Sequence, residues 1–239
     1  MPRYLTEAIG TFFLVATIGF TVTAGTAFAP LAIGSSLMVM VYMGGHVSGA
    51  HYNPAVSLAA LLRGALEARD FLPYVAAQCL GALGAAAVVL LVAGEPFAPA
   101  PSEEFGVLGP LLGEFLFTFA LALVVLQTAT SPRTEGNSYY GLAIGFTLMV
   151  GVFAVGGISG GALNPAVGVG PIVVSGLAGA GSWGPLWLYL VGPFLGGAAA
   201  AGVFRLQEGR SVPEVRPSPP DAEAAGAAVP ADQDLSITG

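Results

Sequence analysis

The chain has 239 residues, of which 55% are hydrophobic and only 9% are charged, and its formal net charge is −7. Soluble domains carry about 25% charged residues, so this composition excludes an ordinary soluble protein and indicates several membrane spans. The first apolar run is too long, and too well followed by others, to be a cleaved signal peptide. The one cysteine, Cys79, excludes an internal disulfide bond, and we expect it to be inert packing in its apolar run.

Six apolar segments each come near the roughly 20 residues that a helix needs to cross a bilayer. The second and fifth are shorter than the others, but each leads directly into a Ser-Gly loop. We expect spans over residues 5–25, 30–46, 71–93, 110–130, 140–156 and 184–205.

The sequence contains an internal repeat. Residues 31–56 read LAIGSSLMVMVYMGGHVSGAHYNPAV, and residues 142–167 read LAIGFTLMVGVFAVGGISGGALNPAV. The copies are identical at 15 of 26 positions, without a gap, at a constant offset of 111 residues. A further pattern, Glu-x-x-x-Thr-x-x-Leu, starts at Glu7 and again at Glu114. Each half holds three spans, an odd number, so the second half enters the membrane from the opposite side and the repeats are inverted.

Each copy ends in an Asn-Pro pair that predicts the start of a short helix. Asparagine is a preferred N-cap, and proline fits the first helical position. We expect short helices over residues 54–62 and 165–174. At 1.5 Å per residue each spans roughly 15 Å, half of a roughly 30 Å bilayer core. Two such helices at corresponding positions of a repeat indicate a transport site at the membrane midplane.

The segments SGAHYNPAV (48–56) and SGGALNPAV (159–167) resemble the paired signature loops of the aquaporin and glycerol-facilitator channels, the major intrinsic protein family. One Asn-Pro-Ala is weak evidence, whereas two, each after a Ser-Gly loop and inside a repeat, are highly specific. The resemblance covers about residues 7–205 and implies an all-α membrane protein, with six transmembrane helices plus two re-entrant half-helices in an inverted 3+3 repeat. The implied pore motif is Asn53, Pro54, Ala55, Asn164, Pro165 and Ala166.

The resemblance also implies a homotetramer with one pore per subunit, and neither a cofactor nor an enzymatic activity. No nucleophile–base pair and no cluster of metal ligands stands out in the sequence, and we expect no nucleic-acid partner. We expect a channel domain over residues 1–207, with repeats over about 4–93 and 111–205. Residues 208–239 are rich in proline, alanine and acidic residues, and we expect them to form a disordered tail.

The positive charges predict the orientation of the chain in the membrane. There is no lysine, and the seven arginines all lie in the two termini or in the loops near 57–70 and 131–138. An even number of spans puts these four segments on one side, which the positive-inside rule makes cytoplasmic. We therefore expect a multi-pass protein of the cell (plasma or inner) membrane with both termini in the cytoplasm. The arginines are Arg3, Arg63, Arg69, Arg133, Arg205, Arg210 and Arg216.

The two half-helices would meet N-terminus to N-terminus, where each carries roughly half a positive charge. This pair would repel cations without an ionised side chain. As N-caps, Asn53 and Asn164 accept bonds from their own helices through their side-chain oxygens. We expect both amide NH₂ groups to donate into the lumen and to orient a water molecule so that its hydrogens point away, interrupting any proton-conducting file.

Buried polar residues around the loops have alternative interpretations. Glu7 and Glu114 lie in apolar spans, where they could relay protons or accept hydrogen bonds from the loop backbone. The resemblance favours loop support, with Gln78 and His46 in the same role. His46 and His51 flank the first loop, where a histidine could instead gate the pore near neutral pH.

The family's narrowest point is a ring of four positions, which spacing from the asparagines assigns to Ile33, Val152, Gly161 and Val167. Water-selective members place an aromatic residue, a histidine and an arginine among these positions, and glycerol channels keep an aromatic corner and the arginine. Here the ring is apolar and lacks a fixed charge. The resemblance to plant vacuolar members that also read NPAV favours water and small neutral solutes such as ammonia, urea or hydrogen peroxide.

Two other functions remain open from the sequence. A wide ring could pass a polyol, which would make the protein a glycerol-type facilitator. Secondary active transporters also use inverted repeats and broken helices, but they need an ion or proton site at the midplane. The midplane candidates here are neutral asparagines.

Overall fold

The computed structural model describes residues 1–208, so the predicted disordered tail lies, apart from its first residue, outside the described residues. Across residues 1–208, six helices are long and apolar enough to cross a membrane, and two shorter apolar helices accompany them. This confirms the predicted fold class. The long helices are α1 (Pro2–Thr23), α2 (Ala29–Ser48), α4 (Ala68–Ala93), α5 (Leu108–Ala129), α6 (Tyr140–Ser159) and α8 (Leu186–Glu208). The short elements are α3 (Pro54–Arg63), α7 (Pro165–Leu177) and the 3₁₀ turns η1 (Glu103–Phe105) and η2 (Pro132–Thr134).

The helix ends follow local signals. α2 and α6 continue to the serine of each Ser-Gly pair, two and three residues beyond the predicted ends. They stop there because Gly49 and Gly160 adopt left-handed backbone conformations with φ of +85°, which favour glycine and end a helix. α7 runs three residues beyond its predicted end, to Leu177.

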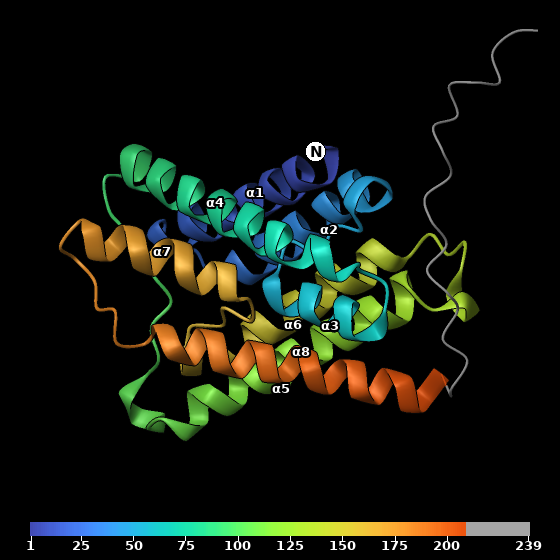
Figure 1. The fold of residues 1–239 in the computed structure, drawn as a ribbon. Coiled ribbons are helices and arrows are strands. Elements are labelled where there is room, and N and C mark those ends of the chain that lie inside the picture. The colour runs from blue at the N-terminus through green and yellow to red at the C-terminus, as the bar shows by residue number, and fades with distance from the viewer. Residues whose placement is uncertain (209–239) are drawn as a thin grey trace, which may run out of the picture.

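The two halves are interlocked by their short helices (Figure 1). α1 packs on α4 in the first half, and α5 packs on α8 in the second. α7 leaves its own half to pack mainly on α4, and α3 packs mainly on α8. Glycine makes the first two contacts close: a Cβ at Gly81 would lie 2.3 Å from the Ala8 carbonyl oxygen, and one at Gly196 would lie 2.5 Å from that of Phe115.

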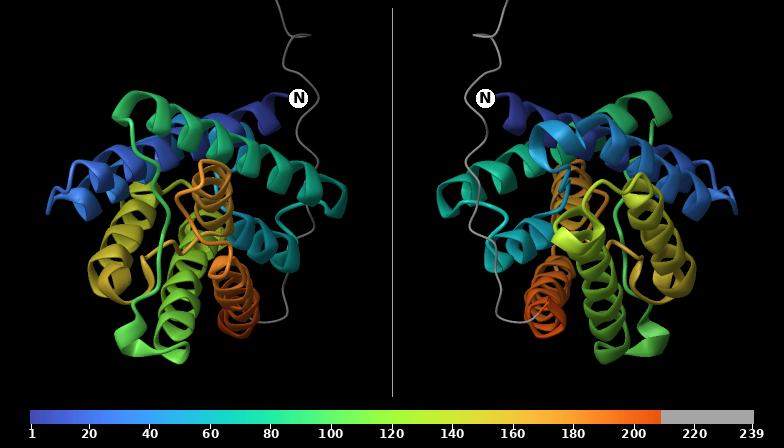
Figure 2. Two further views of the ribbon diagram at one scale, coloured as in Figure 1. Left: turned by 90° about the vertical axis from the view of Figure 1, so that its left-hand side faces the viewer. Right: turned by 90° about the vertical axis from the view of Figure 1, so that its right-hand side faces the viewer.

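Hydrogen bonds place both ends of the described chain at one end of the bundle, which we call the terminal end. Arg3, near the start of α1, pairs with Asp70 at the start of α4. Near the end of α8, Arg205 donates to the Leu62 carbonyl of α3, and Gln207 accepts from Gln127 of α5. The segments that join α4 to α5 and α7 to α8 lie at the opposite end (Figure 2).

Candidate functional site

The candidate site lies where α3 and α7 begin. Asn53 and Asn164 both have extended backbones, with φ of −156° and −161°, as N-cap residues do. Their side-chain oxygens accept hydrogen bonds from the backbone N–H groups of Ala55 and Ala166, each at 2.9 Å. The two caps therefore have the same geometry in the two halves.

The asparagine amides also cross between the halves, which the sequence did not predict. Asn53 Nδ2 donates to the Leu163 carbonyl and Asn164 Nδ2 donates to the Tyr52 carbonyl, each at 2.9 Å. Each asparagine thus holds the residue that precedes the other asparagine. An amide NH₂ has two hydrogens, so this clasp leaves one N–H per asparagine for a ligand, rather than the two expected.

A cavity of about 450 Å³ contains the asparagine pair and all four positions assigned to the ring, Ile33, Val152, Gly161 and Val167. Aliphatic side chains dominate its walls. They come from α1, α2, α5 and α6, and include Leu14, Ile18, Leu37, Leu121, Val125 and Leu148. The cavity is therefore mainly apolar, with a polar point at the asparagines.

Glu7 and Glu114 are fully buried and bind the loop backbone. Glu7 Oε1 accepts from His51 N at 3.0 Å, and Oε2 accepts from Tyr52 N at 2.7 Å. Glu114 accepts from Ala162 N at 2.9 Å and from Leu163 N at 2.6 Å. Because the donors are successive loop N–H groups in both halves, each carboxylate holds its loop in the shape that the helix start requires.

The loops need this support because their backbones are strained. Ala50, Tyr52 and Leu163 have φ near +50°, in the left-handed region that side chains disfavour. Such residues each carry on the order of 1–3 kcal/mol of strain and persist only when their surroundings hold them. The buried carboxylates and the asparagine clasp supply that restraint.

Two further pairs of residues, not identified from the sequence as loop supports, complete the scaffold. Ser48 and Ser159 donate through Oγ to Glu7 and Glu114, at 2.6 and 2.7 Å. Tyr74 and Tyr189 donate to the carbonyls of those serines, at 2.7 and 2.6 Å. Both pairs occupy matching positions in the repeat, and this recurrence is the signal that could have revealed them.

The histidines do not behave alike. His46 is exposed on α2, and no hydrogen bond joins its ring to the loop within the described residues, so His46 does not have the supporting role expected of it. The buried His51 lies within the first loop instead, with Nδ1 3.0 Å from Ser57 Oγ. Gln78 Nε2 donates both to Ser57 Oγ and to Glu7, at 2.9 and 2.8 Å.

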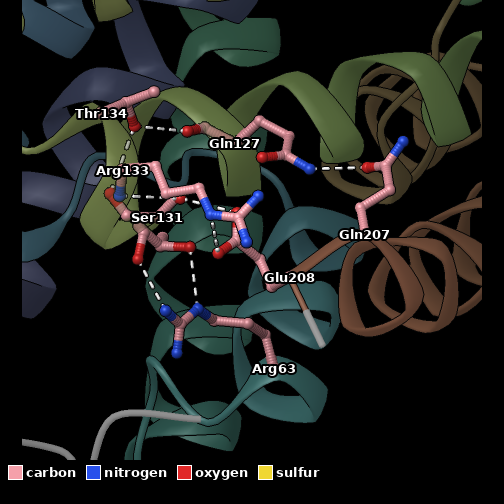
Figure 3. A network of polar contacts seen from close by, with 8 residues as sticks. Arg63, Gln127, Ser131, Arg133, Thr134, Gln207 and Glu208 are labelled. Carbon is pink, nitrogen blue, oxygen red and sulfur yellow. Dashed lines mark hydrogen bonds and ion pairs between the residues drawn. The ribbon is translucent and has the colours of Figure 1, made fainter. Parts of the chain in front are cut away.

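The far end of α3 is fastened at the terminal end of the bundle (Figure 3). Arg63 is buried, and its guanidinium donates to the Thr130 side-chain oxygen at 2.9 Å and to the Thr130 carbonyl at 2.6 Å. Its guanidinium carbon also lies 5.1 Å from the ring centre of Phe204 in α8. Nearby, Glu208 accepts from Ser131 at 2.8 Å and pairs with Arg133 at 3.5 Å. Because Asn53 caps the other end of α3, this network helps to fix the position of Asn53 along the axis of the bundle.

Over residues 1–208, no group of three or more histidine, cysteine, aspartate or glutamate side chains is placed to bind a metal ion. The polar side chains at the site are the caps, the carboxylates and their donors, together with His51, which also lines the cavity. Most of their hydrogen bonds hold the loops in place, and the remaining N–H group of each asparagine is available to a ligand.

Comparisons with known proteins show which family the chain resembles. A sequence model of the major intrinsic protein family matches residues 1–204. Aquaporin NIP1-1 of Zea mays is 37% identical over 217 residues, which cover 86% of this chain and 74% of that protein. Aquaporin TIP1-2 of Musa acuminata is 37% identical over 189 residues, which cover 78% and 73% of the two chains.

Among solved structures, the aquaglyceroporin of Plasmodium falciparum superposes with a TM-score of 0.73 at 23% sequence identity. The superposition covers 85% of this chain and 94% of that one. At this identity the likeness concerns the fold alone. The family match, the two aquaporin relatives and the six-span helical fold agree with one another, and the chain therefore belongs to the major intrinsic protein family of multi-pass membrane channels for water and small solutes.

Proposed function

We propose that this chain is a passive channel for water and small uncharged solutes, with the cavity as its lumen and an apolar ring as its narrowest point. One observation carries the proposal: the starts of α3 and α7, capped by Asn53 and Asn164, share one cavity with four apolar ring positions. Ammonia, urea and hydrogen peroxide are the solute types that fit such a ring. The aquaporin names of the relatives support a channel for water.

The asparagine pair excludes ions in this channel. The two helix N-termini place positive potential at the midplane, which repels cations. The remaining N–H of each asparagine donates to a passing water molecule, whose own hydrogens then point away along the lumen. A file of water oriented in this way does not pass protons.

The ring decides which neutral solutes follow water. Ile33, Val152 and Val167 offer no hydrogen bond, and Gly161 adds no side chain. A solute that needs several hydrogen bonds therefore loses them at the ring, and each unpaired polar group costs about 1–3 kcal/mol. Ammonia and hydrogen peroxide are favoured over polyols because they carry fewer polar groups, and urea is favoured because it is smaller.

In the proposed orientation, the terminal end of the bundle faces the cytoplasm, because all the arginines among residues 1–208 lie at that end. The subunits form a homotetramer with one lumen each, as the family resemblance implies. Protease cleavage of the 208–239 segment in intact, right-side-out cells would contradict this orientation.

The decisive experiment is a stopped-flow swelling assay in proteoliposomes with water, urea, ammonia and glycerol. We expect flux of water and of at least one small solute, with no change on adding an ion gradient. Glycerol flux equal to that of urea would favour a polyol facilitator instead. Uptake that depends on a sodium or proton gradient would favour a transporter, and the absence of any flux would overturn the proposal.

A further inference from the structure

The segment that joins α4 to α5 crosses the end of the cavity opposite the terminal end. Residues 96–102, which we call the strap, have no regular secondary structure. In Figure 2 (left) the strap appears as a green trace that runs from the end of α4 towards the start of α5. Three of its seven residues are prolines, Pro96, Pro99 and Pro101, which lack a backbone N–H and restrict the backbone. The strap is therefore a stiff segment with few hydrogen-bond donors.

Both ends of the strap are fastened to the helical bundle. Phe97 is 7% exposed and packs over Gly19 of α1, where an added Cβ would lie 2.4 Å from its ring. At the other end, Ser102 N donates to the Ile158 carbonyl of α6 at 2.9 Å. The middle of the strap is held between these two attachments.

The middle of the strap lies against the second signature loop. A Cβ at Gly160 would lie 2.8 Å from Ala100 N and 3.0 Å from Pro99 Cβ, so the two backbones are in close contact. The next residue, Gly161, belongs to the ring. Four strap residues, Phe97, Ala98, Pro99 and Ala100, line the same cavity as the ring.

Among residues 1–208, no segment covers the first signature loop in this way. Gly49 corresponds to Gly160, yet the only contact that an added Cβ would make there with the described residues is with the ring of His51, from the same loop. One mouth of the lumen is therefore narrowed by a segment that the internal repeat does not duplicate. Because Gly161 contributes no side chain, the strap faces the part of the ring that is least filled.

We propose that Ala98 and Ala100 of the strap are specificity-determining residues, which form a fifth wall of the ring beside Gly161. The inference rests on the proposed channel function. Small side chains at these positions keep the mouth wide, and any group added there narrows it. Solutes larger than water are affected first, because flux depends steeply on the width of a constriction.

Cysteine modification tests this without relying on a folding comparison, since each variant is its own control before labelling. Ala98→Cys and Ala100→Cys are made in a Cys79→Ala background and reconstituted. Membrane-impermeant methanethiosulfonate reagents of increasing size are then added outside. Ala178→Cys is the matched control, because Ala178 is exposed in the turn after α7 at the same end and does not line the cavity.

We expect labelling at residue 98 or 100 to lower urea flux by roughly threefold or more and water flux by less, with the loss growing with reagent size. Dithiothreitol should restore both fluxes, and labelled Ala178→Cys should conduct as before. Complete labelling, verified by mass spectrometry, that leaves the urea-to-water ratio unchanged would overturn the strap proposal alone. Failure of even the smallest reagent to react at either position would also overturn it. Absence of flux before labelling would instead overturn the proposed channel function.

Discussion

The two halves of the protein build the same loop with different supports. In both, a glutamate, a serine and a tyrosine hold the loop backbone, and an asparagine caps the short helix. The first half adds His51, Ser57 and Gln78, which form a buried polar chain ending on Glu7. At the corresponding positions the second half has only apolar residues: Ala162, Gly168 and Pro193.

Close packing takes the place of that polar chain in the second half. A Cβ at Gly168 would lie 2.5 Å from Tyr189 Cβ, so α7 and α8 are in near-backbone contact there. The comparison shows which parts of the scaffold the loop shape needs. The carboxylate, the serine, the tyrosine and the cap are common to both halves, whereas the surrounding space can be filled either by hydrogen bonds or by backbone contact.

The largest expected effect distinguishes the two carboxylates. Glu7 accepts four hydrogen bonds, two on each oxygen, and Glu114 accepts three. In Glu7→Gln the new amide must face two donors, whereas in Glu114→Gln it can face the single donor, Leu163 N. At about 1.5–3 kcal/mol per charge-assisted bond, we expect losses of roughly 3–6 and 1.5–3 kcal/mol in the free energy of unfolding.

Thermal unfolding of the purified protein in detergent would measure this difference. Glu7→Gln should unfold at the lower temperature. Adding Gln78→Leu to Glu7→Gln should restore little of the lost stability. Equal midpoints for the two glutamine variants would show that the fourth bond on Glu7 adds nothing to stability.

Alanine placed at one repeat position in each half should destabilise for opposite reasons. Gly168→Ala adds a methyl group where Tyr189 leaves no room, and overpacking of this kind costs about 1–3 kcal/mol. Ser57→Ala removes the hydroxyl, so that His51 Nδ1 loses its partner and Gln78 Nε2 keeps only its bond to Glu7, at a cost of about 1–3 kcal/mol. Ser57→Thr keeps the hydroxyl and therefore tests the hydrogen bonds separately from the packing. It should be more stable than Ser57→Ala, and equal stability of the two variants would show that the hydrogen bonds contribute nothing.

Val56 and Val167 both follow their asparagine by three residues, but we place only Val167 in the ring. Val167→Arg should narrow the ring and add a fixed, strongly hydrated charge. We expect urea flux relative to water to fall by about tenfold, equivalent to 1.4 kcal/mol of barrier. Stopped-flow swelling in proteoliposomes measures the ratio, after gel filtration has shown that the variant is folded. An unchanged ratio in a well-folded variant would place the constriction elsewhere.

The smallest expected effect concerns the ends of the short helices. Arg63 ties α3 to Thr130, whereas α7 ends beneath Trp183, which packs on Gly176. Arg63→Met keeps an apolar side chain near Phe204 but loses two hydrogen bonds. Because it also removes the cost of burying a charge, we expect a net loss of only about 1–2 kcal/mol in the free energy of unfolding. Arg69→Met is the control, since Arg69 pairs with Glu67 on an exposed surface where such pairs contribute about 0–1 kcal/mol. Equal thermal midpoints for these two variants would mean that α3 needs no anchor.

The architecture could be predicted from local signals in the sequence. Hydropathy located the six spans, the internal repeat predicted their inversion, and the Asn-Pro pairs located the starts of α3 and α7. These features could be predicted because membrane crossing and helix capping depend on residues that are neighbours in the chain. Spacing from the asparagines also named four positions that line one cavity.

The partners of the polar groups could not be predicted and are known from the three-dimensional fold. The asparagine clasp joins residues more than one hundred positions apart, His51 rather than His46 contacts the loop network, and the strap reaches Gly160 from another connection. Nothing local distinguishes one acceptor carbonyl from another, or one histidine from its neighbour five residues away. Which groups meet is decided by how the two inverted halves interlock, because α3 and α7 each pack mainly on a helix of the opposite half.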